Sequence, residues 1–260
     1  MLRSIHNLIG FTIGATDGEI SKVKDFYFDD ETWKIKYLVV ETGNWLTGRK
    51  VLLSPVALQS PYWDSESFPV NLNKEQIKHS PDIDTDKPVS KQQEAELHKY
   101  YSWPYNEGAG VGFMTTGMIG GVVAPDIPFE DKIAQEVHQD ENPEETFEAV
   151  PQPTGDRHLR SFKETTGYTA QATNGEVGEV EDFLIDDKSW HIPFMVVETG
   201  NWYSGKKILT PTDSISRIEW EDSSVHVNQT TDSLKSSPEF DYSQTSDENF
   251  GQNRYYPENR

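Results

Sequence analysis

The sequence contains no cysteine, which excludes several kinds of site at once. Disulfide frameworks, cysteine-ligated zinc sites and thiol nucleophiles all require this residue. The absence is consistent with a reducing compartment, and we expect a cytoplasmic protein. Apolar residues are also scarce, at 34% of the chain. We therefore expect compact elements joined by much polar connector.

Basic residues are few compared with acidic ones. The chain carries 23 Lys and Arg against 44 Asp and Glu, which gives a formal net charge of −21. A field of this sign repels phosphate backbones and anionic lipid surfaces. We therefore expect no direct nucleic-acid partner, whereas the charge favours solubility.

Long hydrophobic segments are missing as well. The opening MLRSIHNLIGFTIG has a short apolar run without a long hydrophobic region or a small-residue cleavage site, so no signal peptide is predicted. The uncharged run 108–125 is borderline in length for a membrane span, but it is rich in glycine and threonine. We expect no membrane insertion.

Motifs for catalysis are also absent from the sequence. The seven histidines are scattered, and no pair has the spacing of a metalloprotease. The glycines of 108–121 lack the Lys-Ser/Thr of a phosphate-binding loop. The sequence therefore predicts a protein that is not an enzyme, with no catalytic residue, cofactor site or metal site.

What the sequence does contain is one long stretch, present twice. Residues 14–50 recur as residues 171–207 without a gap, and about half of the positions between Gly10 and Gly48 are identical in the two copies. The long insert between the copies indicates a duplicated small domain rather than a solenoid, whose repeats would abut.

Each copy begins with a hairpin signal. Asp17-Gly18 corresponds to Asn174-Gly175, and both dipeptides favour a type I′ turn with φ > 0 at the two central residues. In the following segment, 19–28, the apolar residues recur every two or three positions. Its β-branched and aromatic content, with Gly178 in the second copy, favours a strand that carries a bulge.

A turn at Asp29-Asp30-Glu31-Thr32 separates this segment from a second strand. From Trp33 onward, and from Trp190 in the second copy, apolar residues alternate, which predicts a strand with one buried face. Pro193 cannot donate a ladder hydrogen bond, so we expect it at an edge or a bulge.

Two further apolar segments follow, at residues 51–53 and 68–72, and their counterparts are 208–209 and 225–227. Five or six short strands in about 70 residues are typical of a small closed or nearly closed β barrel. The sequence therefore predicts an all-β fold with two barrels, at residues 1–81 and 158–238.

The barrels are joined by a polar connector, residues 82–157. Pro88 to Tyr101 is a candidate helix with Ser90 as its cap, and an aromatic cluster follows it. The stretch 126–150 is strongly acidic, which is typical of a solvated, largely disordered linker. Residues 239–260 form a polar tail whose Tyr255-Tyr256 repeats the Tyr-Tyr pair of the cluster.

The repeated stretch resembles the PRC-barrel family. The resemblance rests on Gly-Glu-x-x-x-x-x-Asp-Phe at 18–26 and 175–183, on the Asp-Asp turn, and on the Trp-containing strand that ends in Val-Val-Glu-Thr-Gly-Asn-Trp. It covers most of 8–81 and 165–238, and the helix and aromatic cluster resemble stand-alone bacterial members with two such domains. Relatives include the cytoplasmic domain of the photosynthetic reaction-centre H subunit and the C-terminal domain of a ribosome maturation factor. The resemblance implies a barrel used for protein interaction or assembly.

The duplicated carboxylates invite a metal-binding or acid–base hypothesis. They are Glu19, Asp25, Asp29, Asp30 and Glu41, with their second-copy counterparts. An Asp-Asp pair at a turn is mostly turn chemistry, and the EF-hand spacing is absent. A structural role is therefore the favoured interpretation for this set.

Two groups of residues are the better candidates for an interaction surface. The first comes from the repeated Glu-Thr-Gly-Asn-Trp segment and comprises Glu41, Asn44, Trp45, Glu198, Asn201 and Trp202. The second is the aromatic cluster, with Tyr100, Tyr101 and Trp103. Large aromatic residues often dominate interfaces, but both groups could equally close a loop or dock the connector onto a barrel.

We therefore expect a non-enzymatic interaction or assembly protein with an unidentified protein partner. The two barrels would form a pseudo-symmetric pair within the chain, or the chain would form a homo-oligomer. The family resemblance leaves a second hypothesis, an electron-transfer accessory of a photosynthetic reaction centre. A metal-dependent hydrolase on a barrel scaffold is the least favoured alternative.

Overall fold

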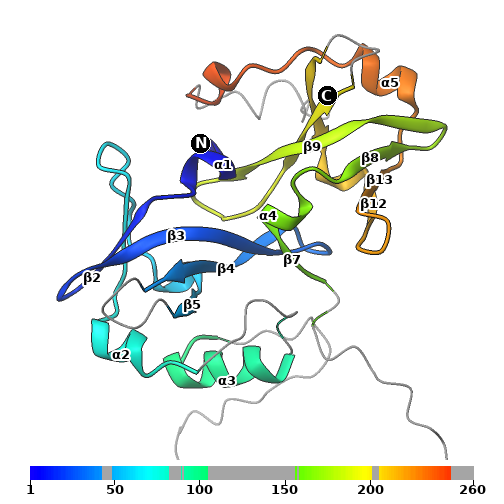
Figure 1. Cartoon of the computed structure of the whole chain (residues 1–260). Helices are drawn as coiled ribbons and strands as arrows, with labels where there is room; N and C mark the ends of the chain where they lie inside the picture. Colours follow the sequence, from blue (N-terminus) through cyan, green and yellow to red (C-terminus); the bar gives the residue numbers. More distant parts are fainter. Residues whose placement is uncertain are drawn as a thin grey trace, which may run out of the picture. The chain divides into compact units, whose positions relative to one another are not determined.

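A computed structural model describes residues 1–42, 49–81, 89, 91–104, 156, 158–200 and 205–246. The duplication in the sequence is repeated in the order of the elements (Figure 1). The first repeat consists of β1 (Leu2–Ser4), α1 (Ile5–Leu8), β2 (Thr12–Ala15), β3 (Gly18–Asp29), β4 (Lys34–Glu41), β5 (Lys50–Leu53), the 3-10 helix η2 (Pro55–Ala57), β6 (Ser67–Pro69) and α2 (Lys74–Lys78).

The second repeat has the same elements and one additional strand. It consists of β7 (Leu159–Ser161), α4 (Phe162–Thr165), β8 (Thr169–Ala172), β9 (Gly175–Asp186), β10 (Phe194–Thr199), β11 (Lys207–Pro211), the 3-10 helix η4 (Thr212–Ser214), β12 (Ile215–Glu219), β13 (Ser224–Val227) and α5 (Thr231–Ser236). Helix α3 (Lys91–Tyr101) follows the first repeat and the 3-10 helix η5 (Tyr242–Ser246) follows the second. The fold is therefore mostly β, and the all-β prediction missed the two short helices of each repeat.

The strands form two separate sheets. One has the order β5-β4-β3-β2-β6 and the other β11-β10-β9-β8-β13-β12. Most pairs are antiparallel, but β2 pairs with β6, and β8 with β13, in parallel. In each repeat, this parallel pairing places a late strand, β6 or β13, beside an early one, β2 or β8. Within the described strands no pairing joins β5 to β6 or β11 to β12, so neither sheet is a closed ring of hydrogen bonds.

The hairpin between β2 and β3 forms, but its predicted type I′ turn was wrong. Ala15 pairs with Gly18, and φ is positive at Gly18 (128°) while Asp17 is not among the residues with positive φ. The side chain of Asp17 instead accepts a hydrogen bond at the start of α2. Its Oδ1 lies 2.9 Å from the backbone N of Lys74, which donates. Asn174 Oδ1 does the same at the start of α5, at 2.7 Å. The position requires a side-chain oxygen at this point, which Asp and Asn both supply.

The predicted start of the second strand was also wrong, because the tryptophans belong to the turn. Trp33 has φ = 52° and Trp190 has φ = 57°, so β4 begins only at Lys34. The ring of Trp33 stacks on Phe28, with 5.7 Å between centroids. Pro193 lies just before β10 rather than at an edge or bulge inside it, and its carbonyl accepts a bond from Thr212 N.

The bulge predicted in residues 19–28 is confirmed. The register of β3 against β4 shifts between Val23 and Asp25. In the second copy β9 and β10 approach so closely at Gly178 that a Cβ there would lie 2.0 Å from the carbonyl oxygen of Glu198. Glycine is therefore required at this point of β9.

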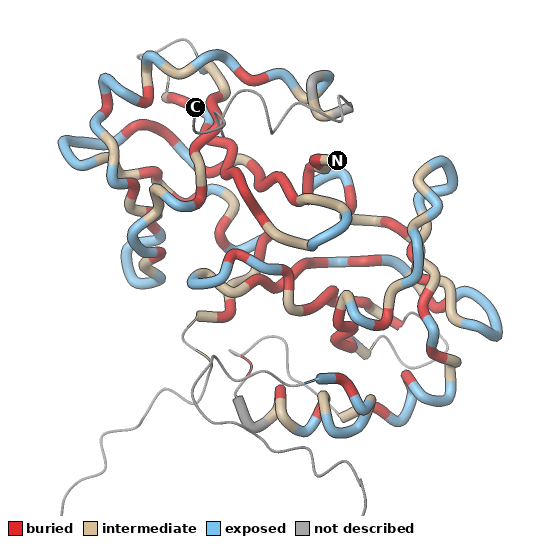
Figure 2. Tube along the Cα trace, turned by 180° about the vertical axis from the view of Figure 1, so that it is seen from behind, coloured by how far each residue is buried: buried red, intermediate tan, exposed pale blue. Residues whose placement is uncertain are grey.

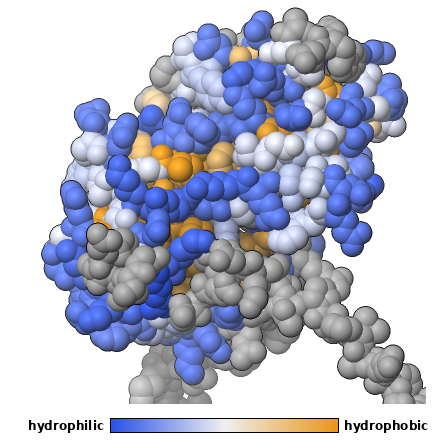
Figure 3. All heavy atoms as spheres, viewed as in Figure 1, coloured by the Kyte–Doolittle hydropathy of each residue, from blue (hydrophilic) through white to orange (hydrophobic). Residues whose placement is uncertain are grey.

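One hydrophobic core contains side chains of both repeats. Phe28 of β3 lies 5.2 Å from Phe183 of β9, and Phe68 lies 5.8 Å from Trp190, between ring centroids. Figure 2 shows buried residues running along the strands. On the face drawn in Figure 3, hydrophilic residues predominate, and hydrophobic ones show in small separate groups.

The predicted helix in residues 88–101 is confirmed as α3, and its start at Ser90 lies outside the described residues. The helix packs on the first repeat: Leu97 is 1% exposed, and His98 Nε2 lies 2.9 Å from the hydroxyl of Tyr37 on β4. No helix in the described residues is long and apolar enough to cross a membrane.

Candidate functional site

The first strand of each repeat pairs with the other repeat. β1 lies antiparallel to β9, with Ser4 opposite Leu184, and β7 lies antiparallel to β3, with Ser161 opposite Tyr27 (Figure 1). Both strands have the sequence Leu-Arg-Ser. The two copies therefore exchange equivalent strands, and we call the region where they meet the seam.

A buried aspartate anchors each exchanged strand. Asp182, which is fully buried, accepts hydrogen bonds from Ser4 Oγ and from the N–H of His6 at 3.1 Å. Asp25 accepts the corresponding bonds from Ser161 Oγ at 2.6 Å and from the backbone N–H two residues later at 3.1 Å. In each case these two donors belong to the other repeat, while the N–H of the following residue, Phe183 or Phe26, donates from the same repeat at 2.8 Å.

These aspartates lie in an environment that disfavours charge. Burial raises the pKa of both Asp25 and Asp182 above the usual range, and the hydrogen bonds that each carboxylate accepts act in the opposite direction. Such a group is costly to bury unless its partners are retained, because an unpaired carboxylate in the interior loses its hydration without compensation.

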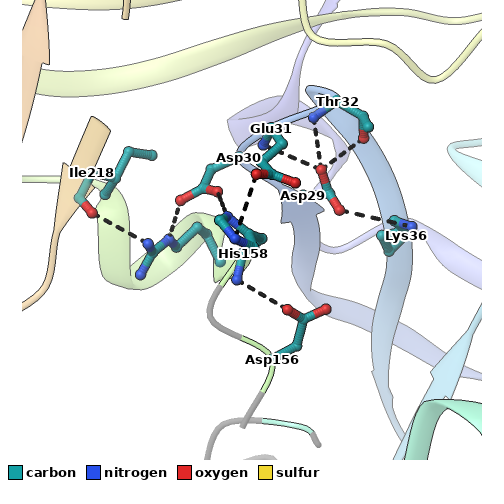
Figure 4. Close-up of polar contacts among 9 residues, drawn as sticks. Asp29, Asp30, Glu31, Thr32, Lys36, Asp156, His158 and Ile218 are labelled. Carbon is teal, nitrogen blue, oxygen red and sulfur yellow. Dashed lines mark hydrogen bonds and ion pairs between the residues drawn. The ribbon is translucent and has the colours of Figure 1, made fainter. Parts of the chain in front are cut away.

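Ion pairs between the repeats surround the buried bonds. Arg160 Nε lies 2.6 Å from Asp30 Oδ2, and His158 Nδ1 lies 2.8 Å from Asp30 Oδ1. The same guanidinium donates to the carbonyl of Ile218 at 3.2 Å. Figure 4 shows how Asp30 and His158 face one another at this point.

The second copy of this arrangement lies on the other side of the seam. Arg3 Nε is 3.1 Å from Asp187 Oδ2. The guanidinium of Arg3 also lies 4.0 Å from the ring centroid of Trp63, and that of Arg160 lies 5.9 Å from Trp220. Each arginine thus contacts a tryptophan of its own repeat and an aspartate of the other.

The seam is also linked by backbone hydrogen bonds across its centre. Lys34 forms an antiparallel bridge with His191, its own counterpart in the other copy. Ile35 N donates to Trp190 O at 2.9 Å, and the corresponding bond in the opposite sense is 2.7 Å. Reciprocal contacts of this kind define an isologous interface, here within a single chain.

The duplicated carboxylates are largely engaged in these structural contacts. Asp29 Oδ1 accepts bonds from the N–H of Glu31 and from both the N–H and the hydroxyl of Thr32, which closes the turn before β4 (Figure 4). Asp25 and Asp30 bind the exchanged strand. Within the described ranges, no three His, Cys, Asp or Glu side chains are placed to bind a metal ion.

Of the predicted interaction residues in the repeated Glu-Thr-Gly-Asn-Trp segment, only the two glutamates lie in the described part. Glu41 Oε2 is 3.2 Å from Lys24 Nζ, and Glu198 is exposed on β10. The predicted interaction residues Asn44, Trp45, Asn201 and Trp202 lie outside the described residues.

The ends of the two loops that contain these residues are held in the same way. Thr42 donates its N–H and its hydroxyl to the carbonyl of Arg49, both at 2.8 Å. Thr199 makes the same pair of bonds to the carbonyl of Lys206, at 2.9 and 2.8 Å.

The cation at the end of each loop also binds the helix that follows. The guanidinium of Arg49 donates to the carbonyls of Lys78, Ser80 and Pro81 at 2.6–3.0 Å. Lys206 Nζ donates to the carbonyl of Ser237. Arg49 and Lys206 are therefore bound where the chain leaves the carboxyl ends of α2 and α5.

The aromatic cluster lies where α3 ends. Tyr101 and Trp103 are stacked with 4.2 Å between ring centroids, and Tyr100 donates its hydroxyl to the carbonyl of Gln76 at 2.7 Å. Burial raises the pKa of Tyr101 to about 12. Tyr101 and Trp103 are therefore mainly packed inward, whereas Tyr100 is 40% exposed.

The exchanged strands were missed by the sequence prediction. Arg3 and Arg160 occupy equivalent positions, and Leu-Arg-Ser is repeated with the same spacing as the rest of the duplicated stretch. That identity at 2–4 and 159–161 was the available signal, although it does not tell which sheet each strand joins.

Comparison with known families agrees with this architecture. Residues 2–62 match the PRC-barrel domain. The match runs from β1 past η2 and thus includes the first exchanged strand and most of the first sheet. A search of curated proteins found no match to the chain.

Proposed function

We propose that this protein is a non-enzymatic interaction or assembly module built from two PRC-like barrels. The PRC-barrel match of residues 2–62 supports the class of module, and the duplication extends it to the second repeat. The strand order supports the barrel shape: β13 returns to β8, so only a contact between β11 and β12 is needed to complete the ring. In this proposal the chain acts in the cytoplasm, and the net charge of −21 directs it away from nucleic acid and membranes.

The observation that carries the proposal is the identical anchoring of two equivalent loops on one scaffold. Thr42 and Thr199 close the loop ends with the same pair of bonds, and the seam joins the repeats that carry them. A partner protein would then contact Trp45 and Trp202 as paired aromatic anchors. Fixed loop ends reduce the entropy that each loop loses on binding, which favours this use.

The test compares full-length protein with Trp45→Ala, Trp202→Ala and the double variant. Each serves as bait in native extract with quantitative mass spectrometry, and the binary affinity of every depleted protein is then measured with purified components. We expect the double variant to bind its partner at least about 10-fold more weakly, the loss typical of an interface hot spot.

Tyr62→Ala is the matched control, because Tyr62 is an aromatic residue that is 63% exposed and lies outside both loops. It should leave the captured set and the affinity unchanged. If the double tryptophan variant captures the same proteins with the same affinities as the parent, the loops are not the binding surface and the proposal fails.

A further inference from the structure

The second sheet carries a small hydrophobic cluster on the face that is turned away from the main core. Its strand members are Leu2 of β1, Leu184 of β9, Phe194 and Val196 of β10, and Leu209 of β11. Phe240, from the segment between α5 and η5, completes the cluster and is only 4% exposed. The neighbouring residues Met195 and Ile208 belong to the main core instead. A segment outside the repeat thus covers this outer face of the second sheet.

The covering segment, residues 239–242, is held in the manner of a bound peptide. Glu239 forms an antiparallel bridge with Ile208 at the edge of β11. The N–H of Phe240 donates to the carbonyl of Lys207 at 2.8 Å. Tyr242 packs against the same cluster, with its ring 5.0 Å from that of Phe240 and 5.3 Å from Lys207 Nζ. Pairing with a strand edge, with side chains at alternate positions turned to the sheet, is β-strand addition. The segment then leads into η5, which packs against β1 (Figure 1).

The first sheet has a different element over the equivalent face. Tyr37 of β4 holds the position of Phe194 (194 − 37 = 157), and its hydroxyl lies 2.9 Å from Nε2 of His98 on α3. Trp103, just after α3, packs edge-on against His98 with 5.9 Å between ring centroids. A helix therefore lies over one of these faces, and an extended segment lies over the other. Because both elements lie outside the repeated sequence, the repeat itself presents this face to an added segment.

The segment on the second sheet leaves one polar atom of its site unsatisfied. Lys207 Nζ pairs with Oε1 of Glu181, whereas Glu181 Oε2 is buried and has no hydrogen-bond partner among the described residues. The same lysine lies over the ring of Tyr242, which places Glu181 beside the segment. A buried carboxylate oxygen without a donor is costly. An occupant that supplies a donor here would therefore bind better than the segment does.

We propose that the outer face of the second sheet is a docking site for an extended segment of another protein, and that residues 239–242 occupy it in cis until such a partner displaces them. This inference goes beyond the proposed function, because the site contains neither Trp45 nor Trp202 and needs no residue of either loop. A failure of the loops to bind a partner would leave it unaffected.

The contacts define the chemistry of the partner segment. Aromatic side chains at two alternate positions take the places of Phe240 and Tyr242, and a hydrogen-bond donor beside them satisfies Glu181. Lys206 and Lys207 place two cations along the edge of β11. Acidic residues between and beside the aromatic ones, as in Glu-Phe-Asp-Tyr, complement these cations.

The test uses the full-length protein and a fluorescently labelled synthetic peptide of residues 237–246, Ser-Pro-Glu-Phe-Asp-Tyr-Ser-Gln-Thr-Ser. In the double variant Phe240→Ala/Tyr242→Ala, the tethered segment loses both of its aromatic anchors. A tethered competitor at an effective concentration of about 1 mM weakens an intrinsic Kd of about 100 μM roughly 10-fold. We therefore expect the peptide to bind the double variant roughly 10-fold more tightly than it binds the parent, as measured by fluorescence anisotropy.

Matched controls make this measurement specific. In the double-variant background, Lys207→Ala should weaken peptide binding about 3-fold, through the lost contact with the second aromatic ring. Lys50→Ala, at the equivalent position of the first repeat, should leave the affinity unchanged. A peptide with alanine in place of Phe240 should bind at least about 10-fold more weakly. A peptide of residues 89–104 represents a helical occupant, and equal or tighter binding of that peptide would overturn the extended one.

A measurement on the parent protein is independent of how the double variant folds. The amide of Phe240 exchanges with deuterium when its bond to Lys207 opens. With the same two constants, 1 mM unlabelled peptide should raise the exchange rate of this amide roughly 5-fold and leave the amides of β9 unchanged. An exchange rate that the peptide does not alter, or no binding of the peptide to the folded double variant, would overturn the proposal.

Discussion

Strand exchange between the repeats predicts which residues are energetically coupled. Ser4 of the first repeat donates to Asp182 of the second, and Asp25 of the first accepts from Ser161 of the second. In a chain without exchange, the same residue types would pair within each repeat, Ser4 with Asp25. A double-mutant cycle therefore distinguishes the two arrangements.

The magnitude can be worked from the bonds that are lost. Ser4→Ala removes a bond to a buried carboxylate and the cap that accepts from Asn7 N at 3.1 Å. A bond to a charged group contributes about 1.5–3 kcal/mol and a cap about 1 kcal/mol. Asp182→Ala also leaves the N–H of His6 without its acceptor, so we expect about 3 kcal/mol from each single substitution. The coupling free energy between Ser4 and Asp182 should be about 2 kcal/mol.

The assay is the free energy of unfolding of the full-length protein in urea at pH 7, for both single variants and the double variant. The matched cycle combines Ser4→Ala with Asp25→Ala, and its effects should add to within about 0.5 kcal/mol. Coupling between Ser4 and Asp25, together with additive effects for Ser4 and Asp182, would refute the exchange of strands.

Two smaller perturbations test local features of the fold by the same measurement. Asp17→Asn should change the free energy of unfolding by less than about 0.5 kcal/mol, because the equivalent Asn174 makes the same bond. Asp17→Ala should lower the free energy of unfolding by about 1 kcal/mol. Equal effects of the two substitutions would contradict the capping role. Gly178→Ala should destabilise the fold by about 3 kcal/mol, because the added Cβ would lie 2.0 Å from the carbonyl oxygen of Glu198. Ser21→Ala, at the equivalent position of the first repeat, should have little effect. A neutral Gly178→Ala would show that β9 and β10 do not approach this closely.

Strands β3 and β4 were predictable because each one has a periodicity of its own. Alternation after the Asp29 turn gave β4, and the mixed spacing of residues 19–28 gave the bulge in β3. The predicted ends of the strands were less accurate than the strands themselves. The left-handed conformation of Trp33 arises from the three hydrogen bonds accepted by Asp29, which no apolar pattern reports.

The short helices were missed for a related reason. Helices of four to six residues, such as α1 and α2, contain too few turns to show a 3.6-residue pattern. The capping box formed by Asn73 and Gln76 was a usable signal for α2.

The seam could not be predicted from local pattern at all. Both copies carry the serine, the arginine and the aspartates, so a self-contained repeat and an exchanged one have the same local sequence. The decision rests on contacts between distant positions, such as Asp25 with Ser161, which are 136 residues apart. The candidate loops were easier to find, because identity over Glu-Thr-Gly-Asn-Trp marks them directly.

The donation of β7 to the first sheet has a consequence during biosynthesis. Among the described strands, β7 (Leu159–Ser161) is the one that pairs with the edge of β3 at Tyr27–Asp29, and about 130 residues must be translated after Asp29 before that strand exists (159 − 29 = 130). At roughly 5–20 residues per second, the ribosome needs on the order of 10 s to supply it. Throughout that interval this part of the β3 edge has no partner strand, and an unpaired strand edge promotes aggregation.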